Sequence, residues 1–186
     1  AHGQKILSAY YDHYRNEFKP PLFTEKNFGL SLASQILLDD IPLSGKVDRI
    51  DNLPANRRVR FVDYKTGAPK TRGVLDKEAD GPDGNYKRQL IFYNLLAQLD
   101  RSFEYQVGET ELDFIEPDKG GVFHREKFAI TPAEVNELKK TIKESVGGIR
   151  ALDFSRTKDT SICSRCDFRS HCWPNGIPAT TLQNQE

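Results

Sequence analysis

The chain has 186 residues, enough for one ordinary domain with a workable hydrophobic core. Its 27 basic and 27 acidic side chains cancel, so bulk charge argues neither for nor against nucleic acid, and a binding surface would need local patches. No stretch reaches the roughly 18 apolar residues of a membrane span, and no secretory signal is visible. We therefore expect no membrane partner. Because the chain contains no Met at all, we expect it to be part of a larger protein.

The N-terminal part of the chain predicts one helix followed by strands. Ile6, Tyr10, Tyr14 and Phe18 recur at helical spacing, and a proline pair then ends the helix. Three strands joined by turns follow, at residues 22–32, 41–51 and 58–65. The turn-rich segment 52–56 favours a hairpin between the last two strands.

The middle of the chain predicts a loop, a helix and two strands. Residues 66–84 are rich in Gly, Pro, Lys and Asp and lack periodicity, which predicts a mobile loop. A helix over residues 85–100 comes next, and strands are expected at residues 110–115 and 122–130.

The C-terminal part begins with a strong helix signal. The sequence from Thr131 to Glu134 is a capping box with proline at the first helical position, and the helix runs to about Ala151. The order αβββαββα, with strands clustered early, indicates an α/β fold with a mixed central sheet flanked by helices. We expect one domain over residues 1–175 and a polar, disordered tail over residues 176–186.

Chemistry concentrates on the two strands of the predicted hairpin. Asp63 and Lys65 are two residues apart, so a strand projects both from one face. Asp48 lies on the preceding strand and can meet Asp63 across the hairpin. Two carboxylates brought together repel each other unless a divalent cation lies between them. Such a site, with an ammonium beside it for a phosphate, suits metal-assisted phosphodiester hydrolysis.

A second pair of polar side chains lies on the helix at residues 85–100. Gln89 and Tyr93 are four residues apart and therefore share one helical face. Core packing alone explains Tyr93, but Gln89 stands among apolar neighbours and indicates a specific partner.

These motifs together resemble a known family. Gly45-Lys46-Val47-Asp48, Asp63-Tyr64-Lys65-Thr66 and Gln89 through Tyr93 occur in the order and with the gaps of the RecB-like branch of the PD-(D/E)xK nuclease superfamily. The stretch is most similar to the C-terminal nuclease-type domain of bacterial UvrD/Rep-type helicases, and the resemblance covers roughly residues 3–172. It implies a restriction-endonuclease-like core.

The resemblance also implies roles for individual residues. Asp48, Asp63 and the backbone carbonyl of Tyr64 would hold Mg²⁺ or Mn²⁺. Lys65 would orient the attacking water or stabilise charge on the phosphate. The catalytic set that it implies is Asp48, Asp63, Lys65, Gln89 and Tyr93, and the DNA-contacting set is Lys87, Arg88, Gln89 and Tyr93.

The first helix departs from the family pattern. Many RecB-like nucleases have a histidine metal ligand four residues after a helix glycine, and here Leu7 stands four residues after Gly3. Glu25 is then a further candidate for a metal carboxylate, although a solvated strand residue explains it equally well.

The three cysteines form the other specific motif, Cys163-x2-Cys166-x5-Cys172. Structural zinc sites and iron–sulfur clusters both use a tight C-x2-C hook. The spacing after the last helix resembles the iron–sulfur staple of some RecB-like nucleases, whose fourth cysteine comes from far upstream. Here the fourth ligand of a 4Fe–4S cluster lies elsewhere, or the cluster is lost, or His171 completes a zinc site, or the thiols are free. Three clustered cysteines favour a reducing cytoplasm over a secreted disulfide scaffold.

Two functions from different classes follow. One is a Mg²⁺-dependent, exonuclease-like DNA nuclease domain joined to the motor domains of a superfamily 1 helicase, acting on single strands or ends in repair or recombination. The other is a catalytically silent module that binds DNA or braces the helicase. Fold alone does not choose between them.

Overall fold

The computed structural model describes residues 2–30, 35–54, 56–76, 85–157 and 160–177. Contacts between residues divide the chain into two compact units, Ala1–Lys143 and Glu144–Glu186. The first unit contains all strands found in the described residues and the predicted nuclease motifs, and the second contains the cysteines. None of the helices in the described ranges is both long and apolar enough to cross a membrane.

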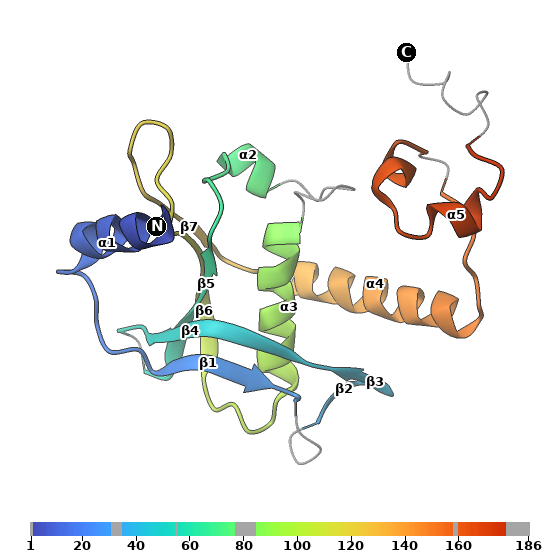
Figure 1. Cartoon of the computed structure of the whole chain (residues 1–186). Coiled ribbons are helices and arrows are strands. Elements are labelled where there is room, and N and C mark those ends of the chain that lie inside the picture. Colours follow the sequence, from blue (N-terminus) through green and yellow to red (C-terminus); the bar gives the residue numbers. More distant parts are fainter. Residues whose placement is uncertain (1, 31–34, 55, 77–84, 158–159, 178–186) are drawn as a thin grey trace. The chain divides into compact units, whose positions relative to one another are not determined.

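A five-stranded mixed sheet forms the centre of the first unit (Figure 1). Its strands run in the order β1-β4-β5-β6-β7, with β5 and β6 parallel and every other neighbouring pair antiparallel. The strands are β1 (Phe23–Phe28), β4 (Gly45–Asn52), β5 (Arg58–Lys65), β6 (Gln106–Phe114) and β7 (His124–Phe128). The predicted α/β class with a mixed sheet flanked by helices is confirmed.

The strand expected at residues 41–51 proves to be two strands. β3 (Ile41–Leu43) pairs with β2 (Ile36–Leu38) in a small hairpin, and β4 begins only at Gly45. The two-residue turn of this hairpin places Asp39 at φ 56°, which short antiparallel turns require and which Asp tolerates. A two-residue turn closes at little entropic cost, so residues 41–43 pair locally instead of extending β4.

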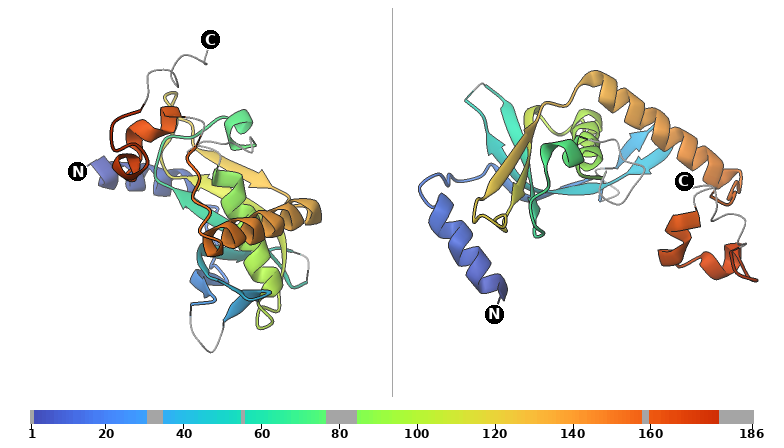
Figure 2. Two further views of the ribbon diagram at one scale, coloured as in Figure 1. Left: turned by 90° about the vertical axis from the view of Figure 1, so that its right-hand side faces the viewer. Right: turned by 90° about the horizontal axis from the view of Figure 1, so that it is seen from above.

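Helix α3 (Asn85–Leu99) covers one face of the sheet and provides the crossover between the parallel strands β5 and β6 (Figures 1 and 2). Leu90, Leu95 and Leu96 on this helix are fully buried. A Cβ atom at Gly45 would stand 2.7 Å from Leu96 Cδ1, so the glycine lets α3 approach β4 closely. The absence of a side chain at the first motif glycine therefore leaves room for Leu96 of this helix.

Helix α1 (His2–Tyr14) contacts the opposite face. The buried Tyr10 hydroxyl donates a hydrogen bond to Asp113 Oδ2 at 2.6 Å, and Arg125 Nε donates to the same oxygen at 3.0 Å. Asp113 pairs with Tyr64 in the β5–β6 register, whereas Asp63 pairs with Leu112. Because side chains alternate along strands, the α1 contact lies on the face away from Asp63.

The remaining elements follow the sequence with one addition. The capping box of α4 (Pro132–Arg150) is confirmed: Glu134 Oε2 accepts the Thr131 N–H at 2.7 Å, and Thr131 Oγ1 accepts the Glu134 N–H at 3.3 Å. Within the expected loop 66–84 the chain forms a short helix, α2 (Arg72–Leu75). Residues 77–84 of that loop lie outside the described residues.

The second unit is small. It contains a 3₁₀ helix, η2 (Thr160–Arg165), and a one-turn helix, α5 (Arg169–Cys172). The Arg156 guanidinium lies 4.9 Å from the centre of the Trp173 ring. Most of the tail expected at residues 176–186 lies outside the described residues.

Candidate metal and phosphate site

The two predicted carboxylates meet where β4 and β5 separate. Regular pairing between these strands ends at Arg49 and Val62, one position before Asp48 and Asp63 would face each other. There the Asp48 side chain replaces the backbone as a partner, since its Oδ2 accepts the Tyr64 N–H at 2.9 Å. The end of the ladder thus fixes one carboxylate beside the other.

Asp63, Lys65, Gln89 and Tyr93 form a closed ring of polar contacts. Lys65 Nζ lies 2.7 Å from Asp63 Oδ2 and donates to Gln89 Oε1 at 2.6 Å. Gln89 Nε2 donates to the Tyr93 hydroxyl at 2.8 Å, and that hydroxyl donates to Asp63 Oδ1 at 2.9 Å. The i, i+4 spacing on α3 therefore brings Gln89 and Tyr93 onto the Asp-x-Lys pair of β5.

Burial changes the pKa values of acidic groups in and beside this ring. Asp63 is only 3 % exposed, and its Oδ2 faces no polar partner other than the Lys65 ammonium among the described residues. Burial, and then the nearby charge of Asp63, raise the pKa of Asp48 above its ordinary range. Burial and the same charge raise the pKa of the Tyr93 hydroxyl, which therefore stays protonated and able to donate.

Glu25 lies on β1 opposite Asp48. The β1–β4 register pairs Thr24 with Arg49 and Lys26 with Val47, and it skips the position between them. Glu25 there has φ 51°, an uncommon conformation for a non-glycine residue. Its exposed carboxylate forms an ion pair with Lys46, and its charge contributes to the raised pKa of Asp48.

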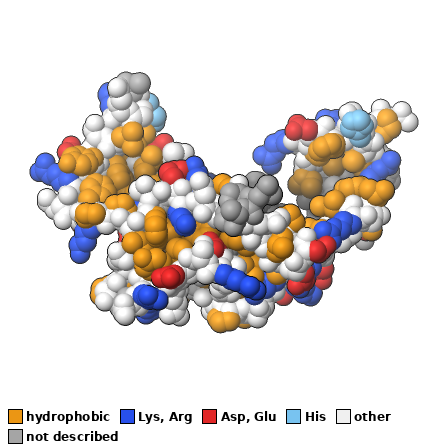
Figure 3. Space-filling model, turned by 90° about the horizontal axis from the view of Figure 1, so that it is seen from below, with side chains coloured by type: hydrophobic (Ala, Val, Ile, Leu, Met, Phe, Trp, Pro, Cys, Tyr) orange, Lys and Arg blue, Asp and Glu red, His pale blue; other side chains and the backbone are white. Residues whose placement is uncertain are grey.

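Basic side chains near the ring, both within and outside the predicted DNA-contacting set, have partners within the chain. Lys87 Nζ lies 2.6 Å from Glu134 Oε1, and Arg88 is exposed. In the loop that precedes α3, Arg72 donates to the Lys127 carbonyl at 2.8 Å and stacks 4.0 Å from the Phe128 ring centre. On the face seen in Figure 3, the Lys and Arg side chains of the described residues are interspersed with Asp and Glu.

The first helix contributes no donor atom at Leu7, the position at which the RecB-like pattern predicts a histidine. Leu7 is 55 % exposed, and α1 packs instead through Tyr10 and Tyr14. At this position the folded protein therefore has an exposed leucine, which cannot bind a metal ion.

The cysteines do not converge. Cys163 is buried, Cys166 is exposed and Cys172 is partly buried. The Cys166 N–H donates to the Cys163 carbonyl at 3.3 Å, which is the tight turn of a C-x2-C hook. Among the described residues, no three His, Cys, Asp or Glu side chains gather closely enough to hold a metal ion. The cysteine site stays a prediction.

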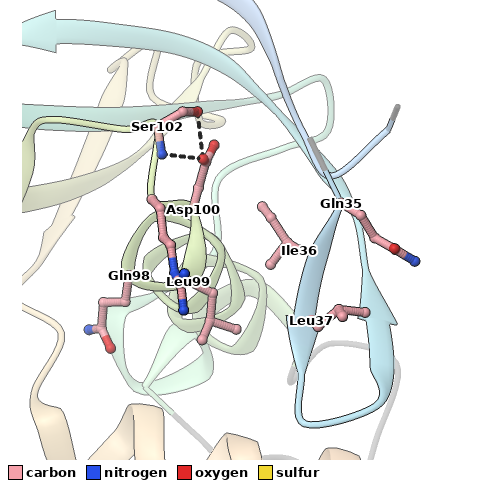
Figure 4. Close-up of a pocket in the computed structure, with 8 residues that line it drawn as sticks. Gln35, Ile36, Leu37, Gln98, Leu99, Asp100 and Ser102 are labelled. Carbon is pink, nitrogen blue, oxygen red and sulfur yellow. Dashed lines mark hydrogen bonds between the residues drawn. The ribbon is translucent and has the colours of Figure 1, made fainter. Parts of the chain in front are cut away.

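The structure also contains pockets away from these motifs. The pocket in Figure 4 lies between the C-terminal end of α3 and the β2–β3 hairpin, and Ile36 and Leu99 contribute to its lining. Asp100 at its edge accepts hydrogen bonds from the Ser102 N–H and hydroxyl. None of its lining residues belongs to the polar ring.

The donor set suits a hard divalent cation. Asp48 and Asp63 are close enough for their charges to interact, and Asp63 Oδ2 is a buried oxygen with one cationic neighbour. Mg²⁺ and Mn²⁺ prefer such carboxylate oxygens and keep several waters, so two carboxylates and a backbone carbonyl are an adequate set.

A mixed sheet with paired carboxylates and a lysine at the end of its central strand defines a nuclease-type core. The sequence matches the PD-(D/E)XK nuclease superfamily over residues 2–173, and the chain therefore belongs to this superfamily. Members of it usually use divalent metals such as Mg²⁺ or Mn²⁺. No curated protein matches the chain significantly.

The raised pKa of Asp48 predicts a stability cost. In the absence of a divalent cation, the folded chain holds the Asp48 proton more tightly than the unfolded chain, so the free energy of unfolding falls as pH rises through the interval between the two pKa values. Asp48→Asn keeps an oxygen for the Tyr64 N–H and removes the charge. The variant should be more stable than the parent at pH 7 and lose that advantage by about pH 4.

Urea unfolding at both pH values, with chelator present, measures this difference. Asp51→Asn is the matched control, because Asp51 lies on the same strand and accepts hydrogen bonds from Arg49. The control should not be stabilised at pH 7. An Asp48→Asn variant that is no more stable than the parent at pH 7 would show that the charge carries no cost.

Proposed function

We propose that the chain is a Mg²⁺- or Mn²⁺-dependent nuclease domain that hydrolyses phosphodiester bonds in DNA. The observation that carries this proposal is the ring formed by Asp63, Lys65, Gln89 and Tyr93, with the Asp48 carboxylate beside it. A structural salt bridge needs only Asp63 and Lys65. The further pairing of Gln89 with Lys65 and of Tyr93 with Asp63 fixes the direction of both charged groups, which positioned catalysis requires.

Each side chain has a role that its contacts suggest. Asp48, Asp63 and the Tyr64 carbonyl would hold the divalent cation, which when bound acidifies water and offsets charge on the phosphate. The Tyr93 hydroxyl, held protonated, keeps Asp63 Oδ1 in one orientation and leaves Oδ2 directed at Lys65. Lys65, held by Gln89, places an ammonium where negative charge grows on the phosphate in the transition state.

Glu25 is a proposed additional carboxylate of this site. Its register position opposite Asp48 and its left-handed backbone support this role, since uncommon backbone conformations gather at functional sites. In the structure Lys46 neutralises Glu25, so this ion pair would have to open for the carboxylate to reach a cation.

The biological setting is proposed from the motifs. Gly45 to Asp48, Asp63 to Thr66 and Gln89 to Tyr93 resemble the RecB-like branch and, within it, the nuclease-type domains of UvrD/Rep-type helicases. In that setting the chain would act on single strands or ends delivered by a helicase motor, in DNA repair or recombination. The catalytically silent alternative rests on Leu7, which replaces a metal ligand.

Asp63→Asn should abolish divalent-dependent cleavage. The change keeps the size and one oxygen of the side chain but removes the charge that binds the cation. We expect the cleavage rate of end-labelled single-stranded DNA in Mg²⁺ or Mn²⁺ to fall on the order of 100-fold or more, the scale at which losing one preorganised electrostatic group slows an enzyme.

Asp51→Asn is the control for this experiment, since Asp51 also lies on the sheet but pairs with Arg49 on the other face. It should cleave at the parental rate. Metal-independent cleavage, or parental cleavage by Asp63→Asn, contradicts the proposed site. Absence of cleavage in the parent supports the silent alternative.

Lys65→Ala separates chemistry from binding. Because Lys65 acts where charge develops, its loss should lower the rate of bond cleavage in single turnover far more than the affinity for DNA. Single-turnover rates and equilibrium binding of the same oligonucleotide give both quantities. Equal losses in rate and affinity would make Lys65 a simple phosphate anchor.

The cysteine motif is proposed as a separate metal site, supported by its spacing and by the turn from Cys163 to Cys166. The chain alone offers three thiolates, so it should not carry an intact 4Fe–4S cluster. Zn²⁺ should protect all three thiols from alkylation, as counted by mass spectrometry. Equal alkylation with and without zinc would contradict a zinc site in this chain.

A further inference from the structure

Tyr86 stands beside the polar ring and has no part in the roles assigned above. It lies in the first turn of α3, three residues before Gln89 and seven before Tyr93, which places all three on one side of the helix. The centre of its ring is 5.1 Å from Lys65 Nζ and 6.2 Å from the ring centre of Phe114. An aromatic ring therefore adjoins the ammonium to which we assign the phosphate contact.

Tyr86 is not needed to hold that ammonium. Lys65 already has two oxygen partners, Asp63 at 2.7 Å and Gln89 at 2.6 Å. Nor is Tyr86 an ordinary core residue, because Phe61 and Phe114 on the same sheet face are fully buried while Tyr86 is partly exposed. Tyr86 therefore offers an apolar surface close to Lys65. A base could stack on it while the phosphate of the same or the next nucleotide contacts the lysine.

We propose that Tyr86 stacks on an unpaired nucleobase next to the phosphate that Lys65 contacts, so that the site takes single-stranded DNA. This inference rests on the proposed nuclease function. Every base has a flat face on which an aromatic side chain can stack, and stacking is tolerant of sequence. A base within a duplex already stacks on its neighbours and is paired, so this platform suits an unpaired strand.

The charge distribution gives stacking added weight. The chain as a whole is neutral, and near the site Lys87 and Arg72 are engaged with Glu134 and Asp76. Nonspecific DNA binding ordinarily depends on basic side chains that displace counterions from phosphates. With those charges partly neutralised, contact with the bases has to supply a larger share of the affinity.

Binding of a fluorescein-labelled oligo-dT strand tests the inference. The measurement is made in the Asp63→Asn background, so that cleavage does not consume the strand. Tyr86→Ala should weaken binding by about five- to a hundred-fold, the range found when one base–aromatic stack is removed. Tyr86→Phe, which keeps the ring, should bind like Tyr86, and Tyr86→Leu should lose most of the affinity.

A single abasic residue moved along the strand identifies the stacked base. At one position, loss of the base should weaken binding to the protein with Tyr86 about as much as Tyr86→Ala weakens binding of intact DNA. With the base missing at that position, Tyr86→Ala should not weaken binding further. Tyr11→Ala is the matched control, because Tyr11 is an exposed tyrosine on α1. It should leave binding unchanged.

Two results overturn the stacking role. Parental affinity in Tyr86→Leu is one, and an equal loss from Tyr86→Ala at every abasic position is the other. If Tyr86→Ala lowers the unfolding temperature markedly, the DNA affinity of the parent is compared with that of Tyr86→Leu instead. Failure of the stacking role can be told apart from failure of the nuclease proposal. The nuclease proposal fails if cleavage survives Asp63→Asn, whatever the binding results show.

Discussion

The repulsion between Asp48 and Asp63 is the constraint around which the rest of the site is arranged. β4 and β5 pair regularly up to Arg49 and Val62 and then separate, which leaves the two carboxylates side by side at partly or fully buried positions. Burial raises the pKa of Asp48, and the nearby charge of Asp63 raises it further. The Lys65 ammonium pairs with Asp63, and its charge offsets only part of the cost at Asp48. The divalent cation that we propose would offset the charge of both carboxylates at this point.

Helix α3 makes this arrangement specific. It carries Gln89 and Tyr93 to the two ends of the Asp63–Lys65 pair, and Tyr86 to the outer side of the lysine. A side chain at Gly45 would meet the Leu96 side chain of this helix. The three motifs, namely Gly45, the strand carboxylates, and Gln89 with Tyr93 on α3, therefore meet where this helix packs on the sheet. A change at Gly45 would act on the site through the helix.

Much of this could be predicted from the sequence because the signals are local. The alternation around Asp63 and Lys65, the four-residue spacing of Gln89 and Tyr93, and the capping box at Thr131 each specify geometry over a few residues. The resemblance to known nucleases supplied the order in which these pieces assemble, and the match of the chain to the superfamily supports it.

Contacts between segments far apart in the sequence could not be predicted from such local patterns. The break between β3 and β4 depends on pairing with residues 36–38, which carry no strong strand signal. The engagement of Lys87 by Glu134 depends on where α4 begins relative to α3. Tyr86 was missed because one aromatic residue near a helix start predicts only core packing. Its place three residues before Gln89 was the signal that could have indicated it.

Titration calorimetry with Mn²⁺ tests the central claim most directly, namely that Asp48 and Asp63 form one cation site. The account predicts one bound ion per chain, an affinity that weakens as pH falls and protons compete for Asp48, and loss of binding in Asp63→Asn. Asp51→Asn should bind as the parent does. Equal binding by the parent and Asp63→Asn would contradict the account.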